Sequence, residues 1–230
     1  SASMELARNL TPTPSYEKAQ LRLQETTEAR HLFSTHETVS VGGARDVRPQ
    51  IKLAARGGVL ETVDLLDIKG TLISARGLKA ALKSESETHP YPRLTEIAAT
   101  LPPPLGLVDA ISRTISDKGD VLDSASSKLA STRAEMRVTH DRLMTKLQKI
   151  ISNDKNATML QEPIITQRDG RYVIPLQAQF KGRIKGIVHD QSSSGATLFI
   201  EPLTTVELNN QARELKLDER DEERRVLAEL

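Results

Sequence analysis

The stretch Arg171–Pro202 limits the possible folds of this chain most strongly, because its residue pattern differs from that on both sides. Its letters are RYVIPLQAQFKGRIKGIVHDQSSSGATLFIEP, with many β-branched residues and a Gly/Ser turn. Such a pattern is typical of short strands. The flanking segments, about 124–152 and 204–230, are charged and have helical periodicity. The sequence therefore predicts a small sheet inserted between two long helices.

Turn signals divide this β-rich part further. Asp169-Gly170 is a strong two-residue hairpin signal, so we expect strands over about 163–166 and 171–175. Further short strands are expected around 180–188 and over 196–201. Together these segments predict an antiparallel sheet.

The helical segment before the sheet carries a narrow apolar stripe. Ser124 is a plausible N-cap for a helix that runs to about residue 152. About 28 residues at 1.5 Å each give a helix of roughly 40 Å. The stripe residues lie seven apart: Leu129, Met136, Leu143 and Ile150. A stripe of this kind packs against one partner helix, and an antiparallel helix over 204–230 would supply that partner.

Residues 1–115 have the pattern of several helices joined by short loops. Pro49 favours a helix start, Gly57-Gly58 favours a stop, and 61–83 has a wide apolar face. We therefore predict a mainly α fold, in which a helical core bundle extends long antiparallel helices that carry a small antiparallel β-sheet at the tip.

Composition narrows the class of protein. Hydrophobic residues make up 37% of the chain, aromatic residues 3% and charged residues 27%, which favours elongated helical structure over one compact globule. The absence of cysteine excludes thiol chemistry and fits a reducing, cytoplasmic location. We find no signal peptide and no apolar run long enough to span a bilayer, so no membrane association is expected. The last residues continue a helical pattern, and we expect the chain to be a fragment of something longer.

Charge is distributed unevenly, although the formal net charge is only +1. Residues 163–200 contain five cations and two anions, a net charge of +3, whereas residues 203–230 contain five cations and eight anions, a net charge of −3. The predicted sheet is therefore the basic part, and any attraction to nucleic acid must be local.

Five cations of this basic part are candidate nucleic-acid contacts. Lys181, Arg183 and Lys185 alternate, so along one strand they would share a face, and Arg168 and Arg171 flank the neighbouring turn. Such a face could bind a phosphate backbone. The alternative is that it forms the solvated side of a half-buried sheet. The residues alone leave both interpretations open.

A second candidate is a polar turn that could present backbone N–H groups and hydroxyls to an anion. It consists of Ser192, Ser193, Ser194 and Gly195. A polar hairpin loop without a ligand is the commoner meaning of such a sequence.

Catalytic and metal-binding patterns are not found in the sequence. There is no GxxxxGKS or GxxxxGKT phosphate loop, so no ATP site is expected in this chain. The histidines lack metal-ligand spacing, and His189-Asp190 has no paired nucleophile. The acidic run 218–223 is interpreted as a solvated helix face with ion pairs. Asn209-Asn210 interrupts the apolar pattern and suggests either a register device or a hinge. We therefore predict no catalytic residue, no metal and no cofactor in this chain.

The stretch RDGRYVIPLQAQFKGRIKGIVHDQSSSGATLFIEPLTTVELNNQARELKLDERDEER, which begins at Arg168, resembles the MutS-II family of bacterial MutS-like proteins. Three upstream pieces support the resemblance in the same order: VGGARDVRP at 41–49, GVLETVDLL at 58–66 and SDKGDVLDSAS at 116–126. The resemblance covers nearly the whole chain.

The resemblance implies a dimeric ATPase whose core bundle extends a lever helix, carries a clamp and returns by a second lever. Residues 1–123 would be the first core part, 124–155 the outbound lever, 156–202 the clamp and 203–230 the start of the return lever. It implies ATP and Mg²⁺ in the parent protein, a homodimer, and in some members a nuclease domain. None of those motifs occurs in this chain, so the fragment itself is expected to lack enzymatic activity.

The resemblance also implies two alternative partners. In the first, family members, which are relatives of mismatch-repair proteins, bind branched DNA and suppress recombination. In the second, they act in ribosome quality control by recognising collided ribosomes through ribosomal RNA. The clamp cations would contact phosphates in either case. A third possibility is a purely structural helical scaffold without a ligand.

Overall fold

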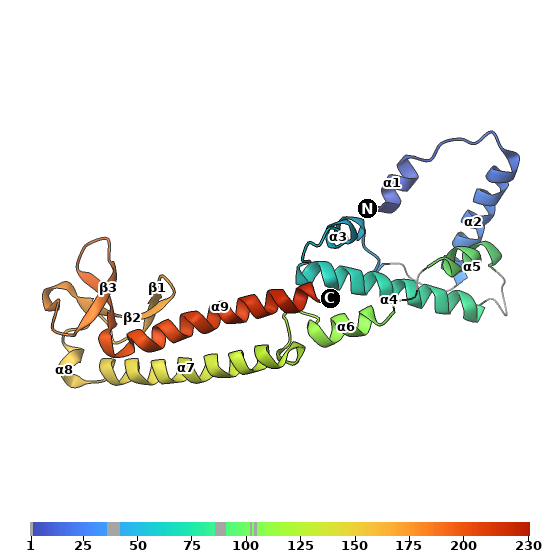
Figure 1. The fold of residues 1–230 in the computed structure, drawn as a ribbon. Helices are drawn as coiled ribbons and strands as arrows, with labels where there is room; N and C mark the ends of the chain where they lie inside the picture. Colours follow the sequence, from blue (N-terminus) through green and yellow to red (C-terminus); the bar gives the residue numbers. More distant parts are fainter. Residues whose placement is uncertain (1, 36–41, 86–90, 102, 104) are drawn as a thin grey trace. The chain divides into compact units, whose positions relative to one another are not determined.

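The computed structural model describes residues 2–35, 42–85, 91–101, 103 and 105–230. The chain divides into two compact units, residues 1–125 with 226–230, and residues 126–225. Figure 1 shows the elements of both units along the chain.

Among the described residues of the first unit, the regular elements are helices joined by loops, and Ile115 and Val121 form one isolated β-bridge. The elements of this unit are α1 (Ala2–Arg8), α2 (Tyr16–Thr35), α3 (Arg48–Ala54), α4 (Thr62–Glu85), α5 (Pro92–Ala99), α6 (Leu107–Thr114) and the short 3-10 turn η1 (Asp123–Ala125). Pro49 lies in the first turn of α3, as the sequence predicted. This confirms the predicted helical character of residues 1–115.

Two separate apolar clusters hold this unit together. In the first, Leu32 of α2 and Leu82 of α4 pack with Tyr91 and Ala98 at α5. Glu28 of α2 accepts hydrogen bonds from the N–H groups of Arg93 and Leu94, both at 3.0 Å, and so caps the start of α5.

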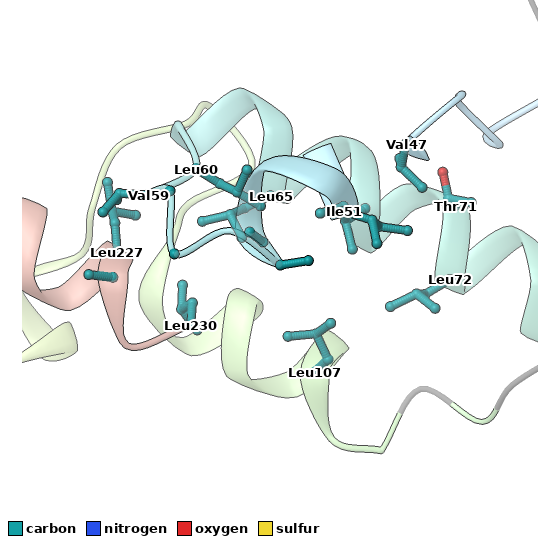
Figure 2. Close-up of a pocket in the computed structure, with 16 residues that line it drawn as sticks. Val47, Ile51, Val59, Leu60, Leu65, Thr71, Leu72, Leu107, Leu227 and Leu230 are labelled. Carbon is teal, nitrogen blue, oxygen red and sulfur yellow. The ribbon is translucent and has the colours of Figure 1, made fainter. Parts of the chain in front are cut away.

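The second cluster joins Leu60, Leu65, Ile111 and Ile115, with Leu227 packed against it. Beside this cluster lies a cavity of about 650 Å³. Figure 2 shows that the side chains lining it are almost all hydrocarbon. Among its described residues, the first unit therefore contains two small apolar clusters.

The second unit combines two long helices with a sheet. Its helices are α7 (Ser127–Ile151), the one-turn α8 (Asp154–Ala157) and α9 (Val206–Ala228), whose last residues belong to the first unit. The strands are β1 (Thr166–Arg168), β2 (Arg171–Gln177), β3 (Gly186–Gln191) and β4 (Thr197–Pro202), and short 3-10 turns η2 (Ala178–Phe180) and η3 (Leu203–Thr205) connect them to their neighbours. Helix α7 begins after Ser126, whose hydroxyl accepts from the N–H of Leu129 at 2.9 Å, so the predicted cap at Ser124 is wrong by two residues.

The sheet has strand order β1-β2-β4-β3, and the neighbouring strands are antiparallel. Asp169 and Gly170 form the predicted turn between β1 and β2, with φ of 51° and 76°, as a type I′ hairpin requires. The sequence predicted a strand over about 163–166, but β1 starts at Thr166, so residues 163–165 lie outside the strand.

The predicted fold class, a helical core bundle with long antiparallel lever helices that carry a small β clamp at the tip, is wrong. Helix α7 and the sheet share one apolar core within a single compact unit. That core consists of Leu143, Leu147 and Ile151 of α7 with Leu160, Ile174, Leu176, Leu198 and Ile200. The physical reason is that α7 has two partners, because the sheet covers its last turns while ion pairs link its first turns to α9.

Candidate nucleic-acid interface

Lys181, Arg183 and Lys185 lie in the connection between η2 and β3. The N–H of Lys181 donates to the carbonyl of Ala178 at 3.1 Å, and the N–H of Arg183 donates to the carbonyl of Phe180 at 3.0 Å. Gly182 has φ of 87°, a value that favours glycine. These turns exclude an extended strand, so the expectation that the three cations alternate along one strand is wrong.

The connection nevertheless presents all three cations to solvent. Phe180 and Ile184 are partly buried and pack against the shared core of the second unit, whereas the three cations are exposed. Lys181, Arg183 and Lys185 make no side-chain hydrogen bond or ion pair with any residue that the structure describes. We call residues 181–185 the basic loop; its positive charge is available to a ligand.

Arg168 has a structural role. Its guanidinium lies 3.9 Å from the centroid of the Phe199 ring, and its Nε donates to Asp190 at 2.9 Å. A cation over an aromatic face is stabilised by the ring quadrupole. Arg168 therefore joins β1 to β4 and β3 through side chains.

Arg171 is likewise paired inside the unit. It donates to the carboxylate of Glu201 at 2.8 Å and to the side-chain oxygen of Asn210 at 2.5 Å. Glu201 is completely buried, and His189 Nε2 lies 2.5 Å from its other oxygen. The five predicted cations thus form two groups, of which Arg168 and Arg171 stabilise the sheet and the basic loop is open.

The polar turn at 192–195 connects β3 to β4. The hydroxyl of Ser192 accepts from the N–H of Thr197 at 3.0 Å, and the N–H of Gly195 donates to the carbonyl of Ser192 at 2.8 Å. Ser192 and Ser194 hydroxyls lie 3.4 Å apart, and the amide of Gln191 donates to the carbonyl of Gly195 at 3.0 Å. These bonds close the hairpin internally and favour the interpretation of a polar loop.

Sequence reasoning missed a second set of exposed cations on α7. Arg142, Lys146 and Lys149 are exposed and are spaced four and three residues apart, so they share one helix face. Lys146 donates to the carbonyl of Thr204 at 3.3 Å, whereas Arg142 and Lys149 have no side-chain partner among the described residues. Helix α7 contains six cations and two anions, and this excess could have been noticed in the sequence.

The acidic run 218–223 bridges two helices. Glu219 and Glu223 accept from Arg133 of α7 at 2.8 and 2.6 Å, and Glu222 accepts from Ser126 at 2.7 Å. The predicted ion pairs of the acidic run with nearby arginines of α9 are confirmed for Arg225–Glu222, and Lys216–Glu219 is a further pair that was not predicted. However, Glu219 and Glu222 are buried, so the solvated face that the sequence suggested is incomplete.

The structure decides between the two roles suggested for Asn209-Asn210, a register device or a hinge. Asn209 is buried at 2% exposure, and its side chain both accepts from the N–H and donates to the carbonyl of Tyr172. This exchange fixes α9 against β2, so Asn209 is a register device.

Metal-binding and membrane-spanning features are both missing from the described part of the chain. Within it, no group of three or more His, Asp or Glu side chains could hold a metal ion; His36 and His89 lie outside it. None of its helices combines the length and the apolar character needed to cross a membrane.

Comparison with known proteins supports the family resemblance. No protein-family model matches the chain. The chain is 40% identical over all its 230 residues to Endonuclease MutS2 of Symbiobacterium thermophilum, and it covers 28% of that protein. Over 96% of the chain, identity to Endonuclease MutS2 of Halalkalibacterium halodurans is also 40%, again with 28% of that protein covered. Endonuclease MutS2 of Alkaliphilus oremlandii is 36% identical over the whole chain, which covers 29% of that protein.

The chain therefore belongs to the MutS-II-like family. It spans less than a third of the length of these relatives. The division into core, levers and clamp at residues 123, 155 and 202 stays a prediction.

Proposed function

We propose that this chain is the nucleic-acid-engaging part of a MutS-II-type protein and that it contacts the phosphate backbone of branched DNA through the basic loop. The observation that carries the proposal is the set of three exposed cations, Lys181, Arg183 and Lys185, held on an anchored loop without described partners. When cations that are not neutralised within the protein bind phosphates, the counterions condensed on the nucleic acid are released, and the affinity therefore depends on salt.

The relatives add a second line of support. They are named endonucleases, a name that implies a nucleic-acid substrate for those proteins. On family membership we also propose that the whole protein is a homodimeric ATPase that uses ATP and Mg²⁺. Residues 1–230 would position nucleic acid, and their phosphate contacts would be insensitive to base sequence.

The test is a triple charge reversal, Lys181→Glu with Arg183→Glu and Lys185→Glu. Binding to a four-way DNA junction, a linear duplex and purified ribosomes is measured at several salt concentrations. The slope of log K against log salt should decrease by roughly 0.9 for each lost phosphate contact on duplex DNA. Circular dichroism and urea unfolding check that the variant remains folded.

A matched control reverses three exposed cations of the first unit, Lys52, Arg56 and Lys79. It changes the net charge equally and should leave the slope close to that of the wild type. Unchanged affinity and slope in the loop variant would disprove the assignment. Salt-dependent binding to ribosomes without binding to the junction would replace DNA by ribosomal RNA as the partner.

A further inference from the structure

A cavity of the second unit lies among α7, the β1–β2 turn and α9, and its volume is about 530 Å³. Small-molecule sites commonly have volumes of about 300–1,000 Å³. The basic loop does not line it. It is therefore a separate feature from the phosphate contacts proposed above.

One wall of this cavity is aromatic and apolar. His140 of α7 and Tyr172 of β2 both line it, with ring centroids 5.5 Å apart and planes at 69°. Met136 and Leu217 contribute apolar surface, although Leu217 is 54% exposed. A flat heterocycle gains stabilisation from stacking on aromatic rings and from contact with a thioether.

The aromatic wall is held in place before any ligand arrives. Both backbone polar groups of Tyr172 are bonded to Asn209, at 2.9 and 3.0 Å. The Tyr172 backbone therefore cannot move without breaking two hydrogen bonds. A preorganised wall loses little conformational entropy on binding.

Polar groups stand at two other sides. Gln167 and Asp169 line the cavity near the hairpin turn, and neither side chain has a hydrogen-bond partner among the described residues. Their amide and carboxylate can bond to the amino and ring nitrogen groups at the edge of a base. The carboxylate would repel a phosphate, so an anionic group has to lie at the opposite, α9 side.

Arg213 supplies a cation on that side. It lines the cavity, is exposed, and makes no side-chain hydrogen bond or ion pair with a described residue. Lys216 also lines the cavity but is paired with Glu219 at 2.7 Å. Arg213 is therefore the cation available to a phosphate, which its planar guanidinium can bind with two parallel hydrogen bonds.

We propose that this cavity binds the nucleoside monophosphate unit of an unpaired nucleotide, with the base against His140 and Tyr172 and the phosphate on Arg213. That the nucleotide belongs to a nucleic-acid strand rests on the proposed function. The same chemistry fits a free nucleotide, and the two arms of the test separate these sources.

The first arm uses adenosine monophosphate with the complete 230-residue chain, isotopically labelled for NMR. The nucleotide should shift the ring resonances of His140 and Tyr172, and ribose 5-phosphate should not. Tyr172→Leu should weaken binding roughly tenfold, since stacking on one aromatic side chain contributes about 1–3 kcal/mol per base. Arg213→Gln should also weaken it, whereas the matched variants Tyr16→Leu and Arg220→Gln should bind like the wild type.

The second arm uses a duplex with one unpaired 2-aminopurine and the same duplex with that base paired. Protein should quench the fluorescence of the unpaired base, and Tyr172→Leu should abolish the quenching while the salt-dependent affinity persists. The charge-reversed loop variant should lower affinity yet retain quenching at saturation.

The outcomes distinguish the two proposals. Junction binding without any effect of Tyr172→Leu in either arm overturns the cavity proposal and leaves the proposed function intact. Shifts with adenosine monophosphate but no binding of any oligonucleotide support the cavity as a free-nucleotide site and overturn the proposed function.

Discussion

Asn209 and Tyr172 exchange two hydrogen bonds: the side-chain oxygen of Asn209 accepts from the Tyr172 N–H at 2.9 Å, and its amide donates to the Tyr172 carbonyl at 3.0 Å. Strand β4 pairs with β2 only from Ile174 onward. The Asn209 side chain therefore bonds to the strand where the partner strand is missing, and it ties α9 to the sheet.

The first prediction concerns this pair. Asn209→Leu has a similar shape but leaves two backbone polar groups without partners, so it should lower the free energy of unfolding by about 2 kcal/mol or more. Urea unfolding measures the change. The matched variant Gln211→Ala removes only a hydrogen bond to Glu135 at the surface and should cost less than about 0.5 kcal/mol. Equal losses in both variants would show that the Asn209 bonds contribute no special stability.

The buried carboxylate of Glu201 gives the second prediction. It is completely buried and holds Arg171 at 2.8 Å and His189 at 2.5 Å. Glu201→Gln retains the shape but leaves the guanidinium without a counter-charge, so it should cost about 3 kcal/mol of unfolding free energy. Glu207→Gln, at an exposed position of α9, is the control. A stability within about 0.5 kcal/mol of the wild type in Glu201→Gln would contradict the role of this ion pair.

The third prediction is a dependence of stability on acid. The hydrogen bonds from Arg225 and then Ser126 hold the pKa of Glu222 at about 2, below its ordinary 4.5. Because the folded-state pKa is depressed, the stabilisation is present above pH 4.5 and is lost as the pH falls from about 4.5 to 2. Urea unfolding of the wild type over this range should show the loss.

Glu222→Gln tests the origin of that acid dependence. The amide cannot titrate, so the variant should have a flatter pH profile between pH 4.5 and 2. Glu219 retains a contribution of its own, since the bonds from Lys216 and Arg133 lower its pKa despite burial. A profile that keeps the full wild-type slope would place the acid sensitivity elsewhere.

The fourth prediction concerns the start of β3. A Cβ atom at Gly186 would lie 2.6 Å from the backbone carbonyl oxygen of Glu201. Since backbone cannot move aside easily, Gly186→Ala should destabilise the second unit by about 1–3 kcal/mol. Gly77 of α4 has open space around it, and Gly77→Ala should instead stabilise its helix by about 0.5–1 kcal/mol. Unfolding curves that move in the same direction for both variants would refute this prediction.

The fifth prediction tests the exposed cations of α7. If nucleic acid follows this helix face, the triple variant Arg142→Gln, Lys146→Gln and Lys149→Gln should reduce the salt slope of junction binding by up to roughly 0.9 per lost contact. Lys52, Arg56 and Lys79 changed to Gln form the control. A slope that is reduced equally by both variants would indicate a general charge effect in place of a local interface.

Local signals in the sequence predicted local structure well. Asp169-Gly170 makes the predicted turn because both residues adopt positive φ, which few other pairs tolerate. Pro49 lies in the first turn of α3 for a similarly local reason. The family resemblance was also available from the residues alone, because it depends on residue order and not on contacts.

The basic loop shows the limit of such patterns. Alternation of Lys181, Arg183 and Lys185 predicted a strand face, but turn bonds and the φ of Gly182 exclude one. Alternation describes a strand only where a neighbouring strand pairs with it, and the pairing of β3 starts at Gly186.

The sequence by itself determined the order of helices and strands, the hairpin turn at Asp169 and the family of the chain. Only the tertiary structure decided that α7 shares its core with the sheet, that Arg168 and Arg171 are paired within the unit while the basic loop is exposed, and that Asn209 fixes α9 to Tyr172. The physical reason is that these features depend on contacts between residues far apart in the sequence, such as Asn209 and Tyr172, which are 37 positions apart, and no local pattern encodes which side chains will meet.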